Sequence, residues 1–234
     1  MSNLATRVAA TATALATAVV IVAISILPFL TSAWVDFDQG WTGALGLTGF
    51  THDELHSATN SILADLVVGP PDFDVTVRGV PVLNERERAH MRDVRGVFGG
   101  FAILSVLSAI GLIAAYVGAR RLGHPERAWS AIRNGARGLA VGVVVAGVVA
   151  FFAFDAAFEV FHQLFFPGGT YTFNPATDRL VQLFPFDFWS QTTMAVGLVI
   201  LVLTVVVAKV AGRRARGASH RIELAHVAAP EAIA

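Results

Sequence analysis

The chain has 234 residues, of which 55% are hydrophobic and only 15% are charged, and its mean hydropathy is +0.63. This composition excludes an intrinsically disordered protein, a nucleic-acid-binding protein and a small disulfide scaffold. The sequence contains no cysteine, which excludes disulfides, thiolate metal ligands and a cysteine nucleophile. The formal net charge is zero, so the distribution of the charges is more informative than their sum.

Four apolar segments are each long enough to cross a bilayer as a helix, which requires about 20 residues. We place the spans at residues 8–34, 97–118, 138–154 and 192–212. The first segment could be a signal peptide, but its apolar run is about twice the usual length, which favours an uncleaved anchor. The spans form a single membrane domain over residues 1–212. The basic tail at residues 213–234 is expected to be cytoplasmic and disordered.

Four spans place both chain ends on the same side of the membrane. That side carries 11 basic and 3 acidic residues, and the other side carries 6 basic and 14 acidic residues. Because basic loops are retained in the cytoplasm, this difference predicts cytoplasmic termini. The exoplasmic segments are then residues 35–96 and 155–191, and we expect any chemistry there. The short basic segments on the terminal side are typical of contacts with anionic lipids.

The first outer segment predicts a small cap on the membrane domain. Thr51 and Glu54 have the spacing of a capping box at the start of a helix over residues 51–66. Residues 73–77 and 80–83 predict a short β-hairpin. The fold class is therefore an all-α membrane protein with four transmembrane helices and an exoplasmic cap that contains a short helix and a hairpin.

The next helix is predicted to start at Asn84, which suits an N-cap, and to run without a break into the second span. Glu85 and Glu87 lie in its first turn, where the helix dipole favours acidic residues. Glu87 and His90 share a face of this helix, and Asp93 lies one turn from His90.

The third span can extend out of the bilayer through residues 151–166. Asp155, Glu159 and His162 lie at positions i, i+4 and i+7 and therefore on one face of that extension. Asp155, close to the span end, is expected to face the bundle interior and to pair there, most simply with an arginine of residues 86–95. The neighbouring aromatic residues suit a membrane interface or a groove for an acyl chain: Phe158, Phe165, Phe166 and Trp189.

Two histidines lie at matching distances from their spans. His90 comes seven residues before the second span and His162 eight after the third, so each lies roughly 10–12 Å beyond the apolar edge in a straight helix. The two imidazoles can thus reach the depth at which a lipid presents its ester groups. Taken singly, each histidine could merely form a hydrogen bond within the cap. His52 and His56 have a metal-binding spacing without a third ligand, so we predict an exposed pair, no metal and no cofactor.

The two histidine segments resemble the two signatures of a bacterial integral membrane family whose characterised members are lipoprotein intramolecular transacylases. The first signature matches Leu-Asn-Glu-Arg-Glu-Arg-Ala-His-Met-Arg-Asp-Val at residues 83–94. The second matches Phe-His-Gln-Leu-Phe-Phe-Pro-Gly at residues 161–168, with Leu-Phe-Pro and Phe-Trp further along. The family usually carries Trp near Tyr171 and Asp near Asn174, so the chain departs from the pattern there.

The resemblance implies transfer of the sn-2 acyl chain of a diacylglyceryl lipoprotein to the α-amine of its N-terminal cysteine. Aminolysis of an ester needs a base for the amine and a proton donor for the oxyanion and the leaving oxygen. We expect His162 to be the base, oriented by Asp155 or Glu159, and His90 to be the donor. The reverse order is the alternative. Arg92 and Asp93 are expected to support the pair.

The expected partners are a diacylglyceryl-modified lipoprotein and membrane lipids, and the expected location is the bacterial cell membrane. Two other functions are open to a chain of this composition. One is a non-enzymatic membrane protein whose cap binds a lipid or a partner, and the other is a lipid-ester hydrolase that uses the same histidine pair with water.

Overall fold

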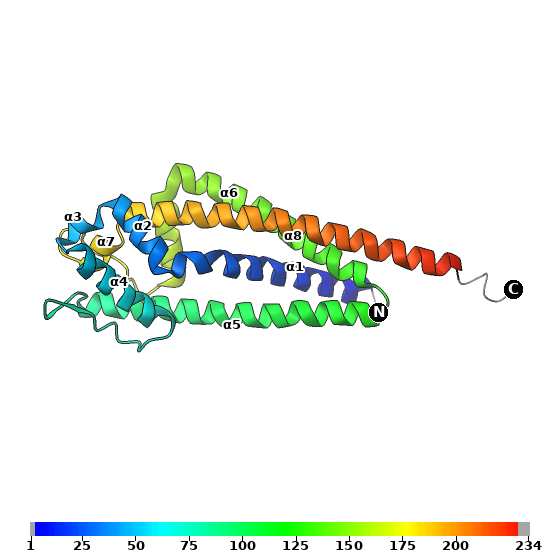
Figure 1. Cartoon of the computed structure of the whole chain (residues 1–234), viewed down its shortest axis with the longest axis horizontal. Helices are drawn as coiled ribbons and strands as arrows, with labels where there is room; N and C mark the ends of the chain where they lie inside the picture. Colours follow the sequence, from blue (N-terminus) through cyan, green and yellow to red (C-terminus); the bar gives the residue numbers. More distant parts are fainter. Residues whose placement is uncertain (1–2, 229–234) are drawn as a thin grey trace. The chain divides into compact units, whose positions relative to one another are not determined.

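The computed structural model describes residues 3–228 (Figure 1). Within that range, four helices are long and apolar enough to cross a membrane, which confirms the predicted all-α membrane architecture. They belong to α1 (Asn3–Ile26), α5 (Glu85–Arg121), α6 (Pro125–Phe165) and α8 (Phe186–Ala228). The chain divides into two compact units. Unit 1 contains residues 3–25, 103–145 and 198–228, and unit 2 contains residues 26–102 and 146–197.

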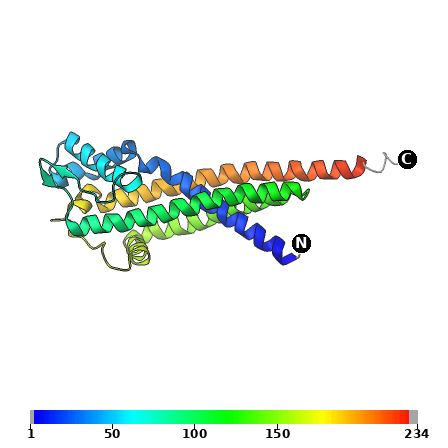
Figure 2. The same ribbon diagram turned by 90° about the horizontal axis from the view of Figure 1, so that it is seen from below.

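Unit 1 consists of helix segments and the short turn at residues 122–124, and α1 is inclined to α5 (Figure 2). Gly135 of α6 packs directly on Ala14 of α1, where a Cβ at residue 135 would clash with the Ala14 carbonyl. Small residues allow this close approach of two membrane helices. Residues 213–228, which we predicted to be disordered, continue α8 as helix. The rest of the predicted tail, residues 229–234, lies outside the described residues.

Unit 2 begins with three short elements that the hydropathy pattern did not predict. They are η1 (Leu27–Leu30), α2 (Ser32–Thr42) and α3 (Ala44–Thr48). Pro28 lies at the start of the 3-10 helix η1, and the Thr31 side chain accepts a hydrogen bond from the Trp34 amide at the start of α2. Gly43 (φ 75°) ends α2 in the left-handed region, which a residue with a Cβ rarely adopts.

Helix α4 (His52–Val67) begins with the predicted capping box. The Thr51 hydroxyl accepts from the Glu54 amide at 3.3 Å, and Glu54 accepts from the Thr51 amide at 2.9 Å. Glu54 also accepts two hydrogen bonds of 2.6 Å from Arg78, which lower the pKa of this carboxylate to about 2. Arg78 lies in the turn between β1 (Thr76–Val77) and β2 (Val80–Pro81), so this ion pair connects the predicted hairpin to α4.

The core of unit 2 lies among α2, α4, the hairpin and α7 (Arg179–Leu183), which Figure 1 shows gathered at the start of α5. Phe73, Ile62 and Leu183 are almost completely buried in it. Gln39 of α2 is also buried, and its amide donates to the Leu183 carbonyl at 2.8 Å. This cap therefore has an apolar core of its own, in a chain without disulfides.

Helix α6 bends at Ala153, whose backbone is not helical (φ −146°, ψ 50°). Figure 1 shows the last part of α6 turning away from the part that precedes it. The expected straight extension over residues 151–166 is therefore interrupted. The expected position of Asp155 is wrong for the same reason: beyond the bend its side chain is exposed, and no arginine among the described residues pairs with it.

Candidate active site

Unit 2 brings His90 and His162 together. His90 lies in the second turn of α5, and His162 lies in the last turn of α6. Their ring centroids are 6.1 Å apart, and the two ring planes are inclined by 24°. The two imidazoles are therefore close enough to contact opposite sides of one small functional group.

The start of α5 fixes the position of His90. The Asn84 side chain accepts from the Glu87 amide at 3.0 Å, and Glu87 accepts from the Asn84 amide at 2.7 Å. The other carboxylate oxygen of Glu87 accepts from the Leu180 amide of α7 at 2.6 Å. Glu87 is almost completely buried and lies one turn before His90, so these bonds anchor the first turn of the helix that carries the histidine.

The tautomer of His162 follows from its hydrogen bond. Its Nδ1 lies 2.7 Å from the backbone carbonyl oxygen of Phe158. A carbonyl oxygen can only accept, so Nδ1 carries the hydrogen and the lone pair of neutral His162 is on Nε2. The basic nitrogen of His162, Nε2, is therefore not occupied by the Phe158 carbonyl.

His90 is connected to a carboxylate through a hydroxyl. Thr170 Oγ1 donates to Asp93 Oδ2 at 3.0 Å, and its oxygen lies 3.5 Å from His90 Nδ1, a long hydrogen bond. Since the Thr170 proton points to Asp93, the His90 Nδ1–H donates to Thr170. A chain of polar groups thus runs from the imidazole to the carboxylate.

Aromatic rings surround the pair. Phe166 is buried and lies 4.9 Å from His90 and 5.6 Å from His162 between ring centroids. Phe173 covers another side of His90 at 5.5 Å, and Phe158 lies 4.1 Å from His162. His90 is only 6% exposed, and burial among these rings favours its neutral form because a buried charge costs free energy.

The two acidic residues expected beside His162 lie elsewhere. Glu159 accepts from the Tyr171 hydroxyl at 2.8 Å and from Gln163 at 2.9 Å, and neither it nor Asp155 contacts the imidazole. Tyr171 in turn packs its ring 5.0 Å from that of His162, and its hydrogen bond to Glu159 raises the pKa of the phenol. Tyr171 therefore contacts both Glu159, by a hydrogen bond, and His162, by ring packing.

The remaining predicted residues have contacts with groups other than the two histidines. Arg92 pairs with Glu85 at 2.6 Å. Phe165 is 43% exposed and packs on Phe161, whereas Trp189 packs on Phe188 and donates to the Phe184 carbonyl. The outward-facing rings of Phe165 and Trp189 match a membrane interface better than the lining of the histidine site.

The other histidine spacing does not form a metal site. His56 contacts Asp36 at 2.7 Å through Nδ1 and accepts from Asn60 at 2.7 Å through Nε2, so both ring nitrogens are occupied. Among residues 3–228, no group of three or more His, Asp or Glu side chains is arranged to bind a metal ion.

Residues 9–189 match the profile of a family described as lipoprotein intramolecular transacylase Lit, and the matched range contains both histidines. The chain belongs to the lipoprotein intramolecular transacylase family. This confirms the resemblance of the two histidine segments. No curated protein matches the chain.

Solved structures of the transacylase Lit from Bacillus cereus have the same fold. One gives a TM-score of 0.77 at 15% identity, and the match covers 94% of this chain and 100% of that one. Two others carry a histidine replaced by arginine or by alanine, and each gives a TM-score of 0.73 at 15% identity. These matches cover 94% of this chain and 94% or 96% of the other. At this identity the likeness shows the membrane-integral fold.

Thr170 and Phe173 are the site residues that the sequence did not predict. Both lie in the loop after α6, and Arg86 anchors this loop by an ion pair of 2.7 Å with the buried Asp178. The Asp178 carboxylate also accepts from the Asn174 amide at 2.7 Å. No periodic pattern marks such a loop, and only the Asn-Pro and Gly-Gly pairs indicated a turn.

Proposed function

We propose that this member of the transacylase family moves the sn-2 acyl chain of a diacylglyceryl lipoprotein to the α-amine of the N-terminal cysteine. The amide bond forms, the sn-2 ester bond breaks, and the product is a lyso-form lipoprotein with a free sn-2 hydroxyl. The pairing of His90 and His162 at 6.1 Å supports this reaction, because both imidazoles can reach the same ester.

His162 is the proposed base for the attacking amine. Its Nδ1–H is bound to the Phe158 carbonyl, so Nε2 can accept the proton that the amine nitrogen loses as it bonds to the ester carbon. This assignment keeps the role expected for His162 but replaces its orienting group. A backbone carbonyl, which cannot change its charge, takes the place of the carboxylates of Asp155 and Glu159.

His90 is the proposed donor to the carbonyl oxygen and then to the leaving sn-2 oxygen. Neutral His90 must first gain a proton, and the substrate amine supplies it, because an α-amine with a pKa of about 7.7–8.0 reaches the site mainly as ammonium. The hydroxyl of Thr170 and the carboxylate of Asp93 stabilise the resulting imidazolium. In total, the ammonium proton passes through His90 to the sn-2 oxygen, and the amine proton that His162 accepts is released to water.

No nucleophile of the protein is needed, because the amine of the substrate attacks directly. The chain has no cysteine, and Thr170, the hydroxyl closest to the pair, donates its proton to Asp93 rather than to a histidine. Ester and amine belong to the same molecule, so holding them in a reactive orientation can contribute about 7–11 kcal/mol.

The aromatic residues beside the pair offer an apolar surface to the acyl chains. Phe154 lies 5.2 Å from Phe186 and 6.0 Å from Phe158, whose ring packs against His162 at 4.1 Å. This row of rings runs from the start of α8 to the imidazole. We propose that an acyl chain packs along it while its ester lies between the histidines.

The distribution of basic residues supports an orientation with both termini in the cytoplasm and the histidine site on the exoplasmic face. The natural absence of cysteine makes this orientation simple to measure with single introduced cysteines. In intact cells, a membrane-impermeant maleimide should label an Asp53→Cys variant and not a Ser219→Cys variant. The opposite labelling pattern would overturn the orientation.

Mass spectrometry of a reporter lipoprotein, co-expressed with this protein in cells that lack such an activity, tests the reaction. Intramolecular transfer leaves the intact mass unchanged, while tandem fragmentation finds one acyl chain on the α-amine and one on the glyceryl group. Loss of an acyl chain from the intact mass would show a hydrolase instead. An unchanged fragmentation pattern would show that the cap only binds lipid or protein.

A further inference from the structure

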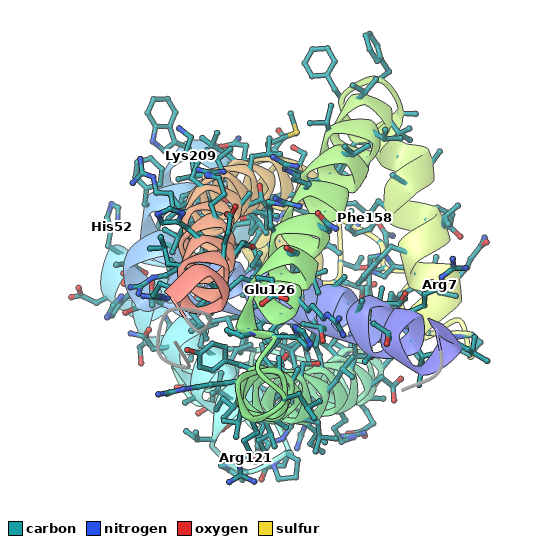
Figure 3. All side chains as sticks on the ribbon, turned by 90° about the vertical axis from the view of Figure 1, so that its right-hand side faces the viewer. Arg7, His52, Arg121, Glu126, Phe158 and Lys209 are labelled. Atoms are coloured by element: carbon teal, nitrogen blue, oxygen red, sulfur yellow. The ribbon has the colours of Figure 1, made fainter. Side chains whose placement is uncertain are left out.

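A second site lies in unit 1, at the end that carries the chain termini. A cavity of about 350 Å³ lies between α6 and α8. Two of its seven lining residues, Ala208 and Gly212, are small. The other five are cationic: Arg133, Arg137, Lys209, Arg213 and Arg216. Figure 3 views the protein from this end and shows Lys209 on α8.

The cations on each helix are spaced so that they lie on one face of that helix. Arg133 and Arg137 are four residues apart on α6, and Lys209, Arg213 and Arg216 follow at i, i+4 and i+7 on α8. Each set therefore shares one helix face. A basic face of each helix lines the same cavity.

None of these five side chains forms an ion pair with an acidic residue in the described part of the chain. Of the five, Arg133 donates to the side-chain amide oxygen of its neighbour Asn134 at 3.4 Å. The arginines of unit 2 differ in their ion pairs, since four of them pair with a carboxylate: Arg78, Arg86, Arg88 and Arg92. Five like charges around one small cavity repel each other, so an anion from outside the chain would stabilise the cluster.

Gly212 gives the cavity its depth. A Cβ at this residue would lie 3.5 Å from Arg133 Cδ and 3.6 Å from Arg216 Nη1, so any larger side chain would occupy the space between the two arginines. The residue is buried, although the cations around it are half-buried or exposed. The site is thus a concave recess in which guanidinium groups surround a small-residue floor.

The cavity lies where the apolar spans end, at residues 138 and 212 of the sequence. Lipid phosphates occupy this level of a membrane, and guanidinium groups bind phosphate through paired hydrogen bonds. We propose that the recess between α6 and α8 binds the phosphate of an anionic phospholipid. The proposal is independent of the histidine site and of the reaction assigned to it.

The full-length protein in nanodiscs tests the site, with native mass spectrometry used to count the lipids that stay bound. We expect phosphatidylglycerol to be retained over phosphatidylcholine. An Arg133→Gln/Arg137→Gln variant should lose that preference by about tenfold or more, since each basic residue near a membrane surface contributes about tenfold or less to anionic-lipid binding. Arg120→Gln/Arg121→Gln is the matched control, because it removes the same charge at the same end but outside the cavity.

A Gly212→Val variant separates a built site from diffuse surface charge, and it keeps the proposal testable if the double variant does not fold. It retains all five cations and fills the recess, so we expect the lipid preference to fall while the net charge is unchanged. Three results would each overturn the proposal: an equal loss in the control, full lipid preference in Gly212→Val, or protection from thermal unfolding by inorganic phosphate without any preference for phosphatidylglycerol.

Discussion

Thr170 links His90 to Asp93 across the loop that follows α6. Its hydroxyl is the only group in the described residues placed to connect the two, with 3.0 Å to the carboxylate and 3.5 Å to the imidazole. Asp93 was predicted to support the histidine pair, because it lies one turn further along α5 than His90. In the structure, the Thr170 hydroxyl lies between Asp93 and His90.

We predict that a Thr170→Val substitution lowers the rate of acyl transfer by about tenfold, because one hydrogen bond that stabilises the transition state is lost. Valine has nearly the same shape, so the fold should be unaffected. Thr170→Ser restores the hydroxyl and should restore most of the rate. Equal rates in the valine and serine variants would show that Thr170 is only a packing residue.

At the scale of single residues, the sequence identified both histidines but not their partners. Helical spacing placed Glu159 on the face of His162, and this spacing is observed. The Glu159 carboxylate nevertheless turns to Tyr171 and Gln163, and the Phe158 carbonyl binds the imidazole. Spacing along one helix defines a shared face, whereas the choice among several hydrogen-bond partners depends on a loop far along the chain.

Among the elements, those with local capping signals were predicted most accurately. The capping box at Thr51 and Glu54 and the N-cap at Asn84 are confirmed. The bend at Ala153 was not predicted, because no proline or glycine marks it. Helices α2, α3 and α7 were also missed, since segments of five to eleven residues contain too few turns for a clear apolar period.

Asp38 connects α2 to α8 and carries a pH-dependent contribution to stability. Its side chain is fully buried, one oxygen accepts from the Thr192 hydroxyl at 3.1 Å, and the other has no hydrogen-bond partner. Burial raises the pKa of Asp38, and the hydrogen bond from Thr192 opposes this in part. The folded protein therefore binds this proton more tightly than the unfolded chain does.

A carboxyl group whose pKa is raised by folding contributes its full stabilisation below its pKa in the unfolded chain, about 3.9. This contribution is lost as the pH rises through the pKa of the folded protein. We therefore predict that the stability of the unmodified protein, relative to an Asp38→Asn variant, falls as the pH rises from about 4. Unfolding midpoints of both proteins across this range measure it. A constant difference between the two would contradict the assignment.

At the scale of the whole molecule, hydropathy predicted the number of spans correctly. A long apolar run has few alternatives in a membrane, because the bilayer requires each crossing segment to satisfy its own backbone hydrogen bonds. The helix through residues 213–228 was missed, since alanine, glycine and arginine without an apolar face suggested disorder. The meeting of His90 and His162 was predicted from equal distances along straight helices, although α6 is bent before it reaches His162.

The central claim is that the two imidazoles act on one ester as a unit. The most direct test compares rates of acyl transfer in purified His90→Ala, His162→Ala and doubly substituted proteins, with His56→Ala as the control histidine outside the site. Each single substitution should lower the rate by about 10²–10⁴-fold, and the double substitution should lower it no further. Independent losses that multiply in the double variant, or full activity in either single variant, would contradict the account.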